Sequence, residues 1–304
     1  MRVQRLCGPR SLQSYRQVLR SIPPAQHHGV SSVPRAFSQT VVAHTPDSPL
    51  TPTSSDAIPQ SLPPRWLNDL KARLGKCIMF GLPDPLATQA AHLLSDLAQN
   101  WKPYLAGSEG FLTDPRRAGL TAHPIVWGEQ DSMGHVNNVQ YIRYAESGRT
   151  NWTRQIGVHF DRARRTEWAD MLTSRSYGLI LKRIEVDFKF PMTWPDRISV
   201  FHKLREMPGR ADSSMLLDVL ILSEGKQRPA ARCVEDVVVY DYKAGRKSVC
   251  PEWMLRQFQI QFDEQEEVKR VNTAKVQAIL DKVRWLEQQS WDRVDAKEDM
   301  GSAG

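Results

Sequence analysis

Apolar and polar residues alternate along much of the second half of the sequence, which is the pattern of strands with one buried face. Turn residues such as Pro208, Gly209 and Gly225 separate the alternating stretches. A short apolar stretch before them predicts one more strand. The five predicted strands cover residues 124–127, 179–190, 197–207, 215–222 and 230–242.

A helical pattern follows the first predicted strand. Asn137 or Asn138 is expected to cap this helix, because an Asn side chain accepts an N–H that the first turn leaves unpaired. Residues of the buried face recur three and four positions apart: Tyr141, Tyr144, Ala145, Gly148, Trp152 and Ile156. The small residues among them indicate a close packing contact. The order strand, helix and four strands predicts an α+β domain, with an antiparallel five-stranded sheet around one buried helix.

Three further stretches with helical spacing lie outside the sheet, at residues 66–78, 85–102 and 251–292. The last is expected to form one amphipathic helix or a helical hairpin. The apolar faces of these helices are expected either to pack internally or to contact a partner. We divide the folded part into an N-terminal helical extension (65–118), a sheet-and-helix domain (119–250) and a C-terminal helical extension with a disordered tail (251–304).

The formal net charge of +7 would by itself suggest nucleic-acid binding, but its distribution along the chain indicates otherwise. Residues 1–46 contain six arginines and no Asp, Glu or Lys, so this segment carries +6 and the remainder carries only +1. The basic charge is therefore not a binding face, and we expect no nucleic-acid partner. No apolar run reaches the roughly 20 residues needed to cross a bilayer, so we also expect no transmembrane segment.

An arginine-rich segment without acidic residues is typical of organellar transit peptides. We interpret residues 1–37 as a mitochondrial transit peptide, with cleavage after Phe37, and predict a matrix location. A disordered basic tail is the alternative interpretation. Residues 38–64 are rich in Ser, Thr and Pro and are predicted to form a disordered linker.

Asp131 lies a few residues before the start of the predicted central helix. The unpaired N–H groups and the dipole of a helix N-terminus stabilise negative charge. An acyl carbonyl held between them would meet a nucleophile or base on one side and oxyanion donors on the other, which is the minimum for hydrolysing an activated ester. The alternative is that Asp131 only hydrogen-bonds the backbone of its own turn.

The sequence around Asp131 resembles a known family signature. The run Asp131-Ser-Met-Gly-His-Val-Asn-Asn138 is followed by Tyr141-Ile-Arg-Tyr144, Glu146 and Arg149. This is similar to the 4-hydroxybenzoyl-CoA thioesterase-like branch of the hotdog superfamily, in a mitochondrial member of the fungal type. The resemblance implies a hotdog fold, in which an antiparallel sheet wraps around a long central helix. It also implies dimers that join their sheets edge to edge and bind acyl-CoA at the dimer interface.

Carried over position by position, the resemblance implies that Asp131 is the catalytic carboxylate. The N–H of Asn138 or Asn137 would then be the oxyanion donor at the start of the central helix. His135 would line the site as an assisting base or a substrate contact, and the alternative is a structural hydrogen bond at the helix entry.

The remaining candidate site residues are expected to bind substrate. On the loop and central helix these are Gly134, Tyr141, Glu146 and Arg149. Glu146 is alternatively placed to form an ion pair with Arg149 or Arg143. Residues 159–175 form a charged connector, in which Arg162, Arg164 and Arg165 either belong to a solvated loop or bind the phosphates of CoA.

The sequence indicates neither a metal site nor a cofactor. The four cysteines form no CxxC pair, and the zinc-helix, GxSxG, dinucleotide and P-loop motifs are missing. We therefore predict an acyl-CoA or acyl-carrier thioesterase without a cofactor, acting as a homodimer or homotetramer. The alternative hypothesis is a catalytically silent hotdog subunit with a structural or binding role beside a protein partner in a mitochondrial assembly.

Overall fold

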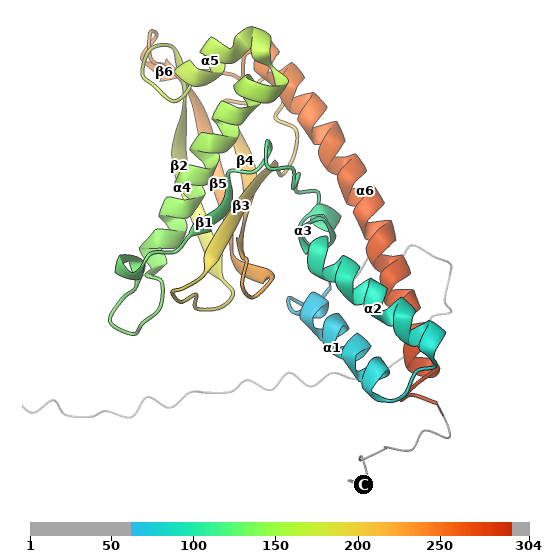
Figure 1. Cartoon of the computed structure of the whole chain (residues 1–304). Coiled ribbons are helices and arrows are strands. Elements are labelled where there is room, and N and C mark those ends of the chain that lie inside the picture. The colour runs from blue at the N-terminus through green and yellow to red at the C-terminus, as the bar shows by residue number, and fades with distance from the viewer. Residues whose placement is uncertain (1–61, 294–304) are drawn as a thin grey trace, which may run out of the picture. The chain divides into compact units, whose positions relative to one another are not determined.

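A computed structural model describes residues 62–293 of the chain. The predicted transit peptide, nearly all of the predicted linker and the predicted C-terminal tail lie outside this range. One antiparallel sheet has the strand order β1-β3-β4-β5-β2, with the short β6 paired to β5 (Figure 1). The strands are β1 (Leu120–Pro124), β2 (Tyr177–Phe188), β3 (Arg197–Leu204), β4 (Ser214–Ser223), β5 (Arg228–Asp241) and β6 (Arg246–Lys247).

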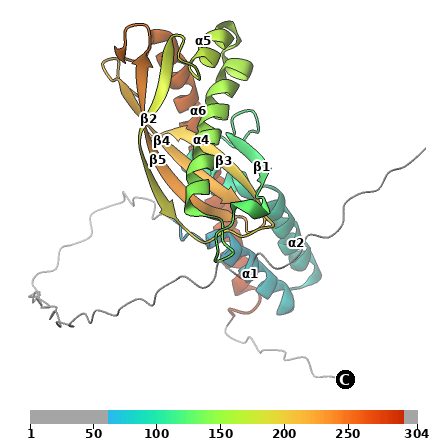
Figure 2. The ribbon, with the colours of Figure 1, turned by 90° about the vertical axis from the view of Figure 1, so that its left-hand side faces the viewer.

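The central helix α4 (Asn138–Gln155) lies across one face of this sheet (Figure 2). Its Tyr141, Tyr144 and Ala145 are buried against inward-facing strand residues such as Val200 and Ile221. Every second residue of the central strands faces α4, as the alternation in the sequence predicts. The structure confirms the predicted α+β class and the wrapped-helix arrangement implied by the hotdog resemblance.

Gly148 allows α4 to approach the sheet closely. A Cβ atom at this position would lie 2.8 Å from Val200 Cγ1 and 2.8 Å from His202 Cε1. A Cβ atom on Gly119 would likewise lie 2.6 Å from the carbonyl oxygen of Gly148. The absence of side chains therefore lets the segment before β1, α4 and β3 meet, in agreement with the close contact that the small residues indicated.

The first strand differs from the prediction. It covers Leu120–Pro124 rather than residues 124–127, and Trp127–Glu129 forms a 3₁₀ turn. Among the described strands β1 lies at an edge and pairs only with β3, with Leu120 opposite Val200 and an irregular register after Leu120. Backbone pairing with β3, rather than apolar alternation, defines this strand. Its position is therefore hard to predict from the sequence.

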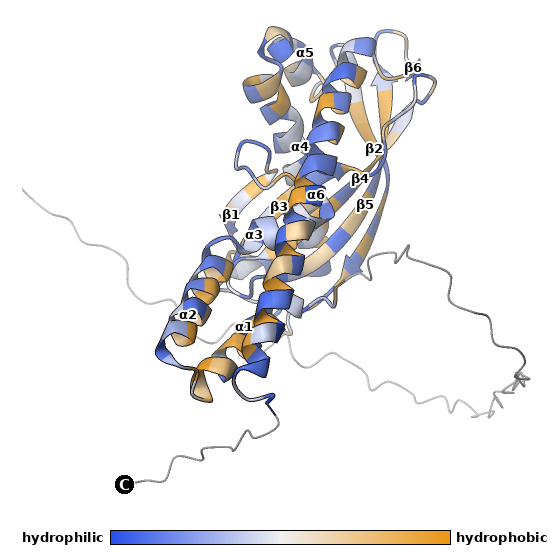
Figure 3. Cartoon of the chain, turned by 90° about the vertical axis from the view of Figure 1, so that its right-hand side faces the viewer, coloured by the Kyte–Doolittle hydropathy of each residue, from blue (hydrophilic) through white to orange (hydrophobic). Residues whose placement is uncertain are grey.

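The helical extensions form a second core on the other face of the sheet (Figure 3). They comprise α1 (Trp66–Met79), α2 (Asp84–Gln99), α3 (Trp101–Leu105) and α6 (Glu252–Gln288). α6 is one continuous helix, so the helical hairpin that was the alternative does not form. Leu74 of α1 and Leu286 of α6 are buried in one cluster with Phe201 of β3. The apolar faces of the extensions are thus covered largely by one another and by the outer face of the sheet.

The charged connector after α4 is not the loop that its arginines predict. A π-helical turn at Ile156–Phe160 and a 3₁₀ turn at Arg162–Arg164 lead into α5 (Arg165–Asp170). Trp168 is fully buried and packs edge-on against Trp253 of α6, with ring centroids 5.0 Å apart. Burial of this apolar side chain outweighs the polarity of its neighbours and orders the segment.

Candidate active site

Asp131 occupies a tight turn between β1 and α4. Its Oδ1 atom accepts the N–H of Met133 at 2.8 Å and that of His135 at 3.3 Å. Its backbone closes the turn through an N–H bond to the carbonyl of His135 at 2.8 Å. The side chain is exposed, and within residues 62–293 no group binds its Oδ2 atom. One carboxylate oxygen of Asp131 therefore stabilises the turn, and the other faces solvent.

The helix that follows begins at Asn138, with Asn137 as its cap. The Asn137 side chain accepts the N–H of Val139 at 3.0 Å, which satisfies one of the free donors of the first turn. The N–H of Asn137 donates to the carbonyl of Glu129 at 2.9 Å. Asn138 is exposed, and its N–H has no acceptor within the described part of the chain. Of the two proposed oxyanion donors, Asn138 is the one whose N–H is available.

His135 and Gly134 shape the turn through their backbones. Gly134 has a φ of 75°, which an L side chain rarely adopts. His135 is half-buried; its carbonyl accepts the Asp131 N–H, and its own N–H donates to Oδ1 of the Asp131 side chain. Among the described residues, its imidazole makes neither a hydrogen bond nor an ion pair with the Asp131 carboxylate. The structural contact at the helix entry is therefore present, and a role of the ring as a base remains a prediction.

Tyr141 joins the start of α4 to the end of β2. Its hydroxyl donates to the carbonyl of Phe190 at 3.4 Å and accepts the N–H of Met192 at 3.1 Å. Burial raises the pKa of Tyr141, so the phenol is neutral at physiological pH. The Tyr141 hydroxyl thus binds backbone in this chain, while substrate binding by this residue remains a prediction.

A buried ion pair joins α4 to the sheet. Arg149 Nη1 lies 2.5 Å from Glu235 Oε1, and His202 Nε2 lies 3.6 Å from Glu235 Oε2. Burial acts to raise the pKa of Glu235, but His202 and Arg149 beside it outweigh burial and hold that pKa below its ordinary value. Arg149 therefore pairs with Glu235 and not with Glu146, which was one alternative from the sequence. Neither Glu235 nor His202 is among the predicted site residues, although a charged residue at an inward-facing position of a strand is uncommon and points to a buried ion pair.

Glu146 and Arg149 line a cavity of about 370 Å³ beside the second half of α4. We call it the α4 cavity. Its other walls include Thr153 of α4 and the start of β2 at Gly178 and Leu179. Two of the predicted substrate-binding residues thus meet at one cavity. Asp131 does not line this cavity, because it lies at the opposite end of α4.

The three connector arginines lie just beyond the C-terminal end of α4. Arg164 Nη1 is 3.4 Å from Glu167 Oε1, and its guanidinium is 5.7 Å from the ring centre of Trp253. Arg162 and Arg165 are exposed. All three follow α4 rather than precede it, so within one chain they lie at the other end of this helix from Asp131.

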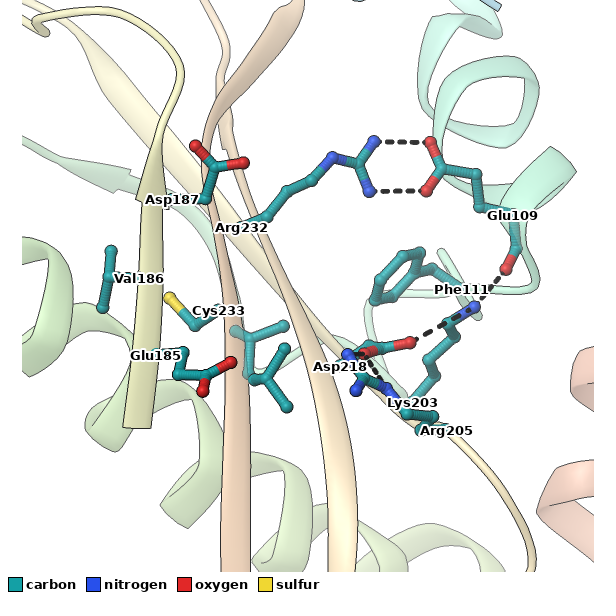
Figure 4. A pocket seen from close by; sticks show the side chains of 12 residues that line it. Glu109, Phe111, Glu185, Val186, Asp187, Lys203, Arg205, Asp218, Arg232 and Cys233 are labelled. Carbon is teal, nitrogen blue, oxygen red and sulfur yellow. Dashed lines mark hydrogen bonds and ion pairs between the residues drawn. The ribbon is translucent and has the colours of Figure 1, made fainter. Parts of the chain in front are cut away.

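A second cavity, of about 390 Å³, lies between the outer face of the sheet and the segment after α3 (Figure 4). The basic side chains that line this cavity are already paired with neighbouring groups. Arg232 binds Glu109 through two contacts of 2.6 Å, and Lys203 donates to the carbonyl of Glu109 at 2.6 Å. These contacts join the helical extension to the sheet on the side opposite α4.

Other chemistries find little support within residues 62–293. The structure has no cluster of three or more metal-ligating side chains in this range. Cys77, Cys233 and Cys250 are free and buried, and burial raises the pKa of Cys233 to about 12 and that of Cys250 to about 11. These two thiols are therefore not reactive nucleophiles at neutral pH. Within the same range, no helix is long and apolar enough to cross a membrane.

Comparison with known proteins points to one superfamily. Residues 125–258 match the family model described as the Thioesterase-like superfamily, which is a little less than half of the chain. No curated protein sequence matches the chain. The matched region includes the Asp131 turn, α4 and the strands that follow, so the superfamily resemblance is supported. The particular branch and the mitochondrial fungal type remain predictions.

Solved structures with similarity to this chain include several thioesterases. A thioesterase from Thermus thermophilus, complexed with coenzyme A and Zn, is 22% identical over 46% of this chain and 90% of its own, with a TM-score of 0.36. YbaW, a probable thioesterase from Escherichia coli, is 19% identical over 46% and 94%, with a TM-score of 0.36. A DHNA-CoA thioesterase from Staphylococcus aureus is 14% identical over 50% and 91%, with a TM-score of 0.35.

Proposed function

We propose that this protein hydrolyses the thioester of an acyl-CoA or acyl-carrier substrate. The observation that carries the proposal is that the turn before α4 has a carboxylate oxygen of Asp131 free of hydrogen bonds among the described residues, and that the N–H of Asn138 at the start of α4 is free there as well. The Asp131 carboxylate attacks the thioester carbonyl or activates a water molecule, and the carbonyl oxygen becomes negative. The Asn138 N–H and the helix dipole stabilise that charge. The C–S bond then breaks, and because a thiolate leaves readily the site needs no strong general acid. After direct attack, water hydrolyses the mixed anhydride and frees Asp131; after water activation, the proton taken by Asp131 passes to the leaving thiolate.

A second copy of the chain would complete this site. Trp127 and Met133, on either side of Asp131 in the loop before α4, are 72% and 77% exposed, and exposed apolar side chains that gather in one place mark interaction sites. β2 has twelve residues and, within residues 62–293, pairs only with β5, so one of its edges is free of any described strand. We propose a homodimer in which two β2 strands pair antiparallel across a two-fold axis. The homotetramer predicted as the other state would add a second pair of chains.

This pairing supports a role for the connector arginines. The start of α4 lies beside the end of β2, because Tyr141 and Val136 contact Phe190 and Met192. The end of α4 lies beside the start of β2. In an antiparallel β2 pair, the turn of one subunit therefore faces the region of Arg162, Arg164 and Arg165 in the other. We propose that these arginines bind the phosphates of CoA across the interface.

The catalytic proposal is tested by replacing Asp131 with Asn in the full-length chain. The amide of this variant is not able to act as nucleophile or base, but its oxygen retains the bonds to Met133 and His135. We expect Asp131→Asn to lower kcat/KM on an acyl-CoA panel at least about 100-fold. The matched control is Asp114→Asn, because Asp114 also accepts a backbone N–H in an exposed turn. Full activity of Asp131→Asn would overturn the assignment.

The mitochondrial location and the silent-subunit alternative are tested on cell extracts. We propose a matrix location from residues 1–37, which lie outside the described range. Internal packing of α1 and α6 favours the free enzyme over the subunit, because it removes much of the need for a partner. We expect a tagged full-length chain to fractionate with the mitochondrial matrix and to elute as a dimer or tetramer. Elution with a large assembly, together with inactivity on the acyl-CoA panel, would favour the subunit.

A further inference from the structure

The α4 cavity has polar walls next to the buried core. Hydroxyl and charged groups line it: Glu146, Arg149, Thr150, Thr153, Thr173 and Ser174. Thr153 is fully buried, and its Oγ1 atom has no hydrogen-bond partner within the described residues. A buried hydroxyl without a partner costs free energy, so natural structures rarely keep one without a role. The Thr153 hydroxyl therefore has unused hydrogen-bonding capacity at the wall of this cavity.

Arg149 also has hydrogen-bonding capacity to spare. Its Nη1 atom binds Glu235, while the other nitrogens of its guanidinium have no acceptor among the described residues. Glu235 neutralises the Arg149 charge, and the carboxylate of the exposed Glu146 adds a negative charge at the cavity. A carboxylate or phosphate ligand would be repelled by Glu146. An alkyl chain would leave the remaining guanidinium nitrogens of Arg149 and the Thr153 hydroxyl without hydrogen bonds.

The position of the cavity connects it to the proposed reaction. Its walls include Gly178 and Leu179 near the start of β2, while the Asp131 turn lies near the end of β2. Antiparallel pairing of two β2 strands would therefore place the cavity of one subunit beside Asp131 of the partner subunit. A thioester held at that carboxylate would place its acyl group in the α4 cavity, and the flexible pantetheine arm of CoA would turn back to the connector arginines at the same end of α4.

We propose that the α4 cavity binds the acyl group of the substrate, and that Arg149 and Thr153 select an uncharged acyl group carrying a hydroxyl or keto oxygen. This inference rests on the proposed thioesterase function. The acyl oxygen accepts from the Arg149 guanidinium and exchanges a hydrogen bond with the Thr153 hydroxyl. An alkyl acyl group of the same length binds less well, because it buries these donors unpaired.

The first test compares two substrates of equal chain length, 3-hydroxybutanoyl-CoA and butanoyl-CoA. We expect the full-length protein to prefer the hydroxylated substrate, and Thr153→Val to lower that preference in kcat/KM about tenfold. Thr153→Val keeps the shape of the side chain and removes an unpaired hydroxyl, so its melting temperature should not fall. The control is Thr166→Val, an exposed position on α5 that is outside the cavity. An unchanged preference in Thr153→Val would overturn the proposal, and a lower melting temperature would then indicate a structural hydroxyl.

The second test measures binding without turnover. Calorimetry on Asp131→Asn should show tighter binding of 3-hydroxybutanoyl-CoA than of butanoyl-CoA, and adding Thr153→Val should remove the difference. This result would support the cavity assignment even if the native chain hydrolyses neither thioester, in which case only the proposed function fails. Equal hydrolysis of both substrates by the native chain would retain the thioesterase function and overturn the selection for an acyl oxygen.

Discussion

Arg232 on β5 and Glu109, after α3, form a two-point ion pair in which each contact is 2.6 Å long (Figure 4). Glu109 belongs to the N-terminal extension, whereas Arg232 belongs to the sheet. The planar guanidinium matches the carboxylate, so the pair fixes orientation as well as distance. The pair therefore fastens the extension to the outer face of the sheet, away from α4.

We predict that Arg232→Lys loosens this attachment, because an ammonium group does not reproduce a two-point contact. Arg232 is 37% exposed, so solvent screening limits the loss of unfolding free energy to about 0.5–1 kcal/mol. Urea denaturation measures the effect. The control is Arg270→Lys, whose exposed pair with Glu267 lies along α6 and should contribute nothing measurable. Equal effects of both variants would contradict a special role for the Arg232 pair.

The ion pair between Arg149 and Glu235 is expected to contribute far more. Glu235→Gln leaves a buried guanidinium without its counter-charge, which costs about 3 kcal/mol of unfolding free energy. The double variant Arg149→Met with Glu235→Leu should recover much of this loss, because it removes both buried charges. Denaturant titration of the two variants checks the prediction. A double variant that is less stable than Glu235→Gln would contradict it.

Stability should also depend on pH through Glu235. His202 and Arg149 outweigh the effect of burial and hold the pKa of this carboxyl below its ordinary value of 4.5. A group with a lowered pKa in the folded state stabilises the fold above its unfolded pKa, and this contribution is lost as the pH falls through the folded value. We expect the free energy of unfolding of the native chain to decrease as the pH is lowered below 4.5. The difference in this free energy between the native chain and Glu235→Gln should become smaller over the same range. A difference that is as large in acid as at neutral pH would contradict this.

The sheet and central helix were predictable because their signals are repetitive. The apolar residues of β3, β4 and β5 include Val200, Val219 and Ala231, which are buried against α4, and apolar strand segments of this kind are recognised in a sequence. β1 was misplaced, because an edge strand with an exposed surface carries no such apolar segment. The connector after α4 was misread for the converse reason, since one buried Trp168 orders a segment that is otherwise rich in arginine.

The candidate site likewise has parts that the sequence predicts and parts that it does not. The Asp131 turn and the Asn137 cap depend on residues close in sequence, so local turn and capping rules were sufficient. The contact between Arg149 and Glu235 joins residues 86 positions apart, which no local rule specifies. The α4 cavity depends further on the packing of α4 against the start of β2, and cavity shape follows only from the folded chain.

The close contact at Gly148 gives a last prediction, for which α1 offers a matched control. A Cβ at Gly148 would lie 2.8 Å from both Val200 Cγ1 and His202 Cε1, and each neighbour is itself fully buried. Gly148→Ala should therefore lower the unfolding free energy by about 1–3 kcal/mol through overpacking. Gly75 lies within α1 with no atom within 4 Å of such a Cβ, so Gly75→Ala should raise it by about 0.5–1 kcal/mol through helix propensity. Urea denaturation of the two variants should give changes of opposite sign, and the same sign for both would show that α4 does not approach β3 this closely.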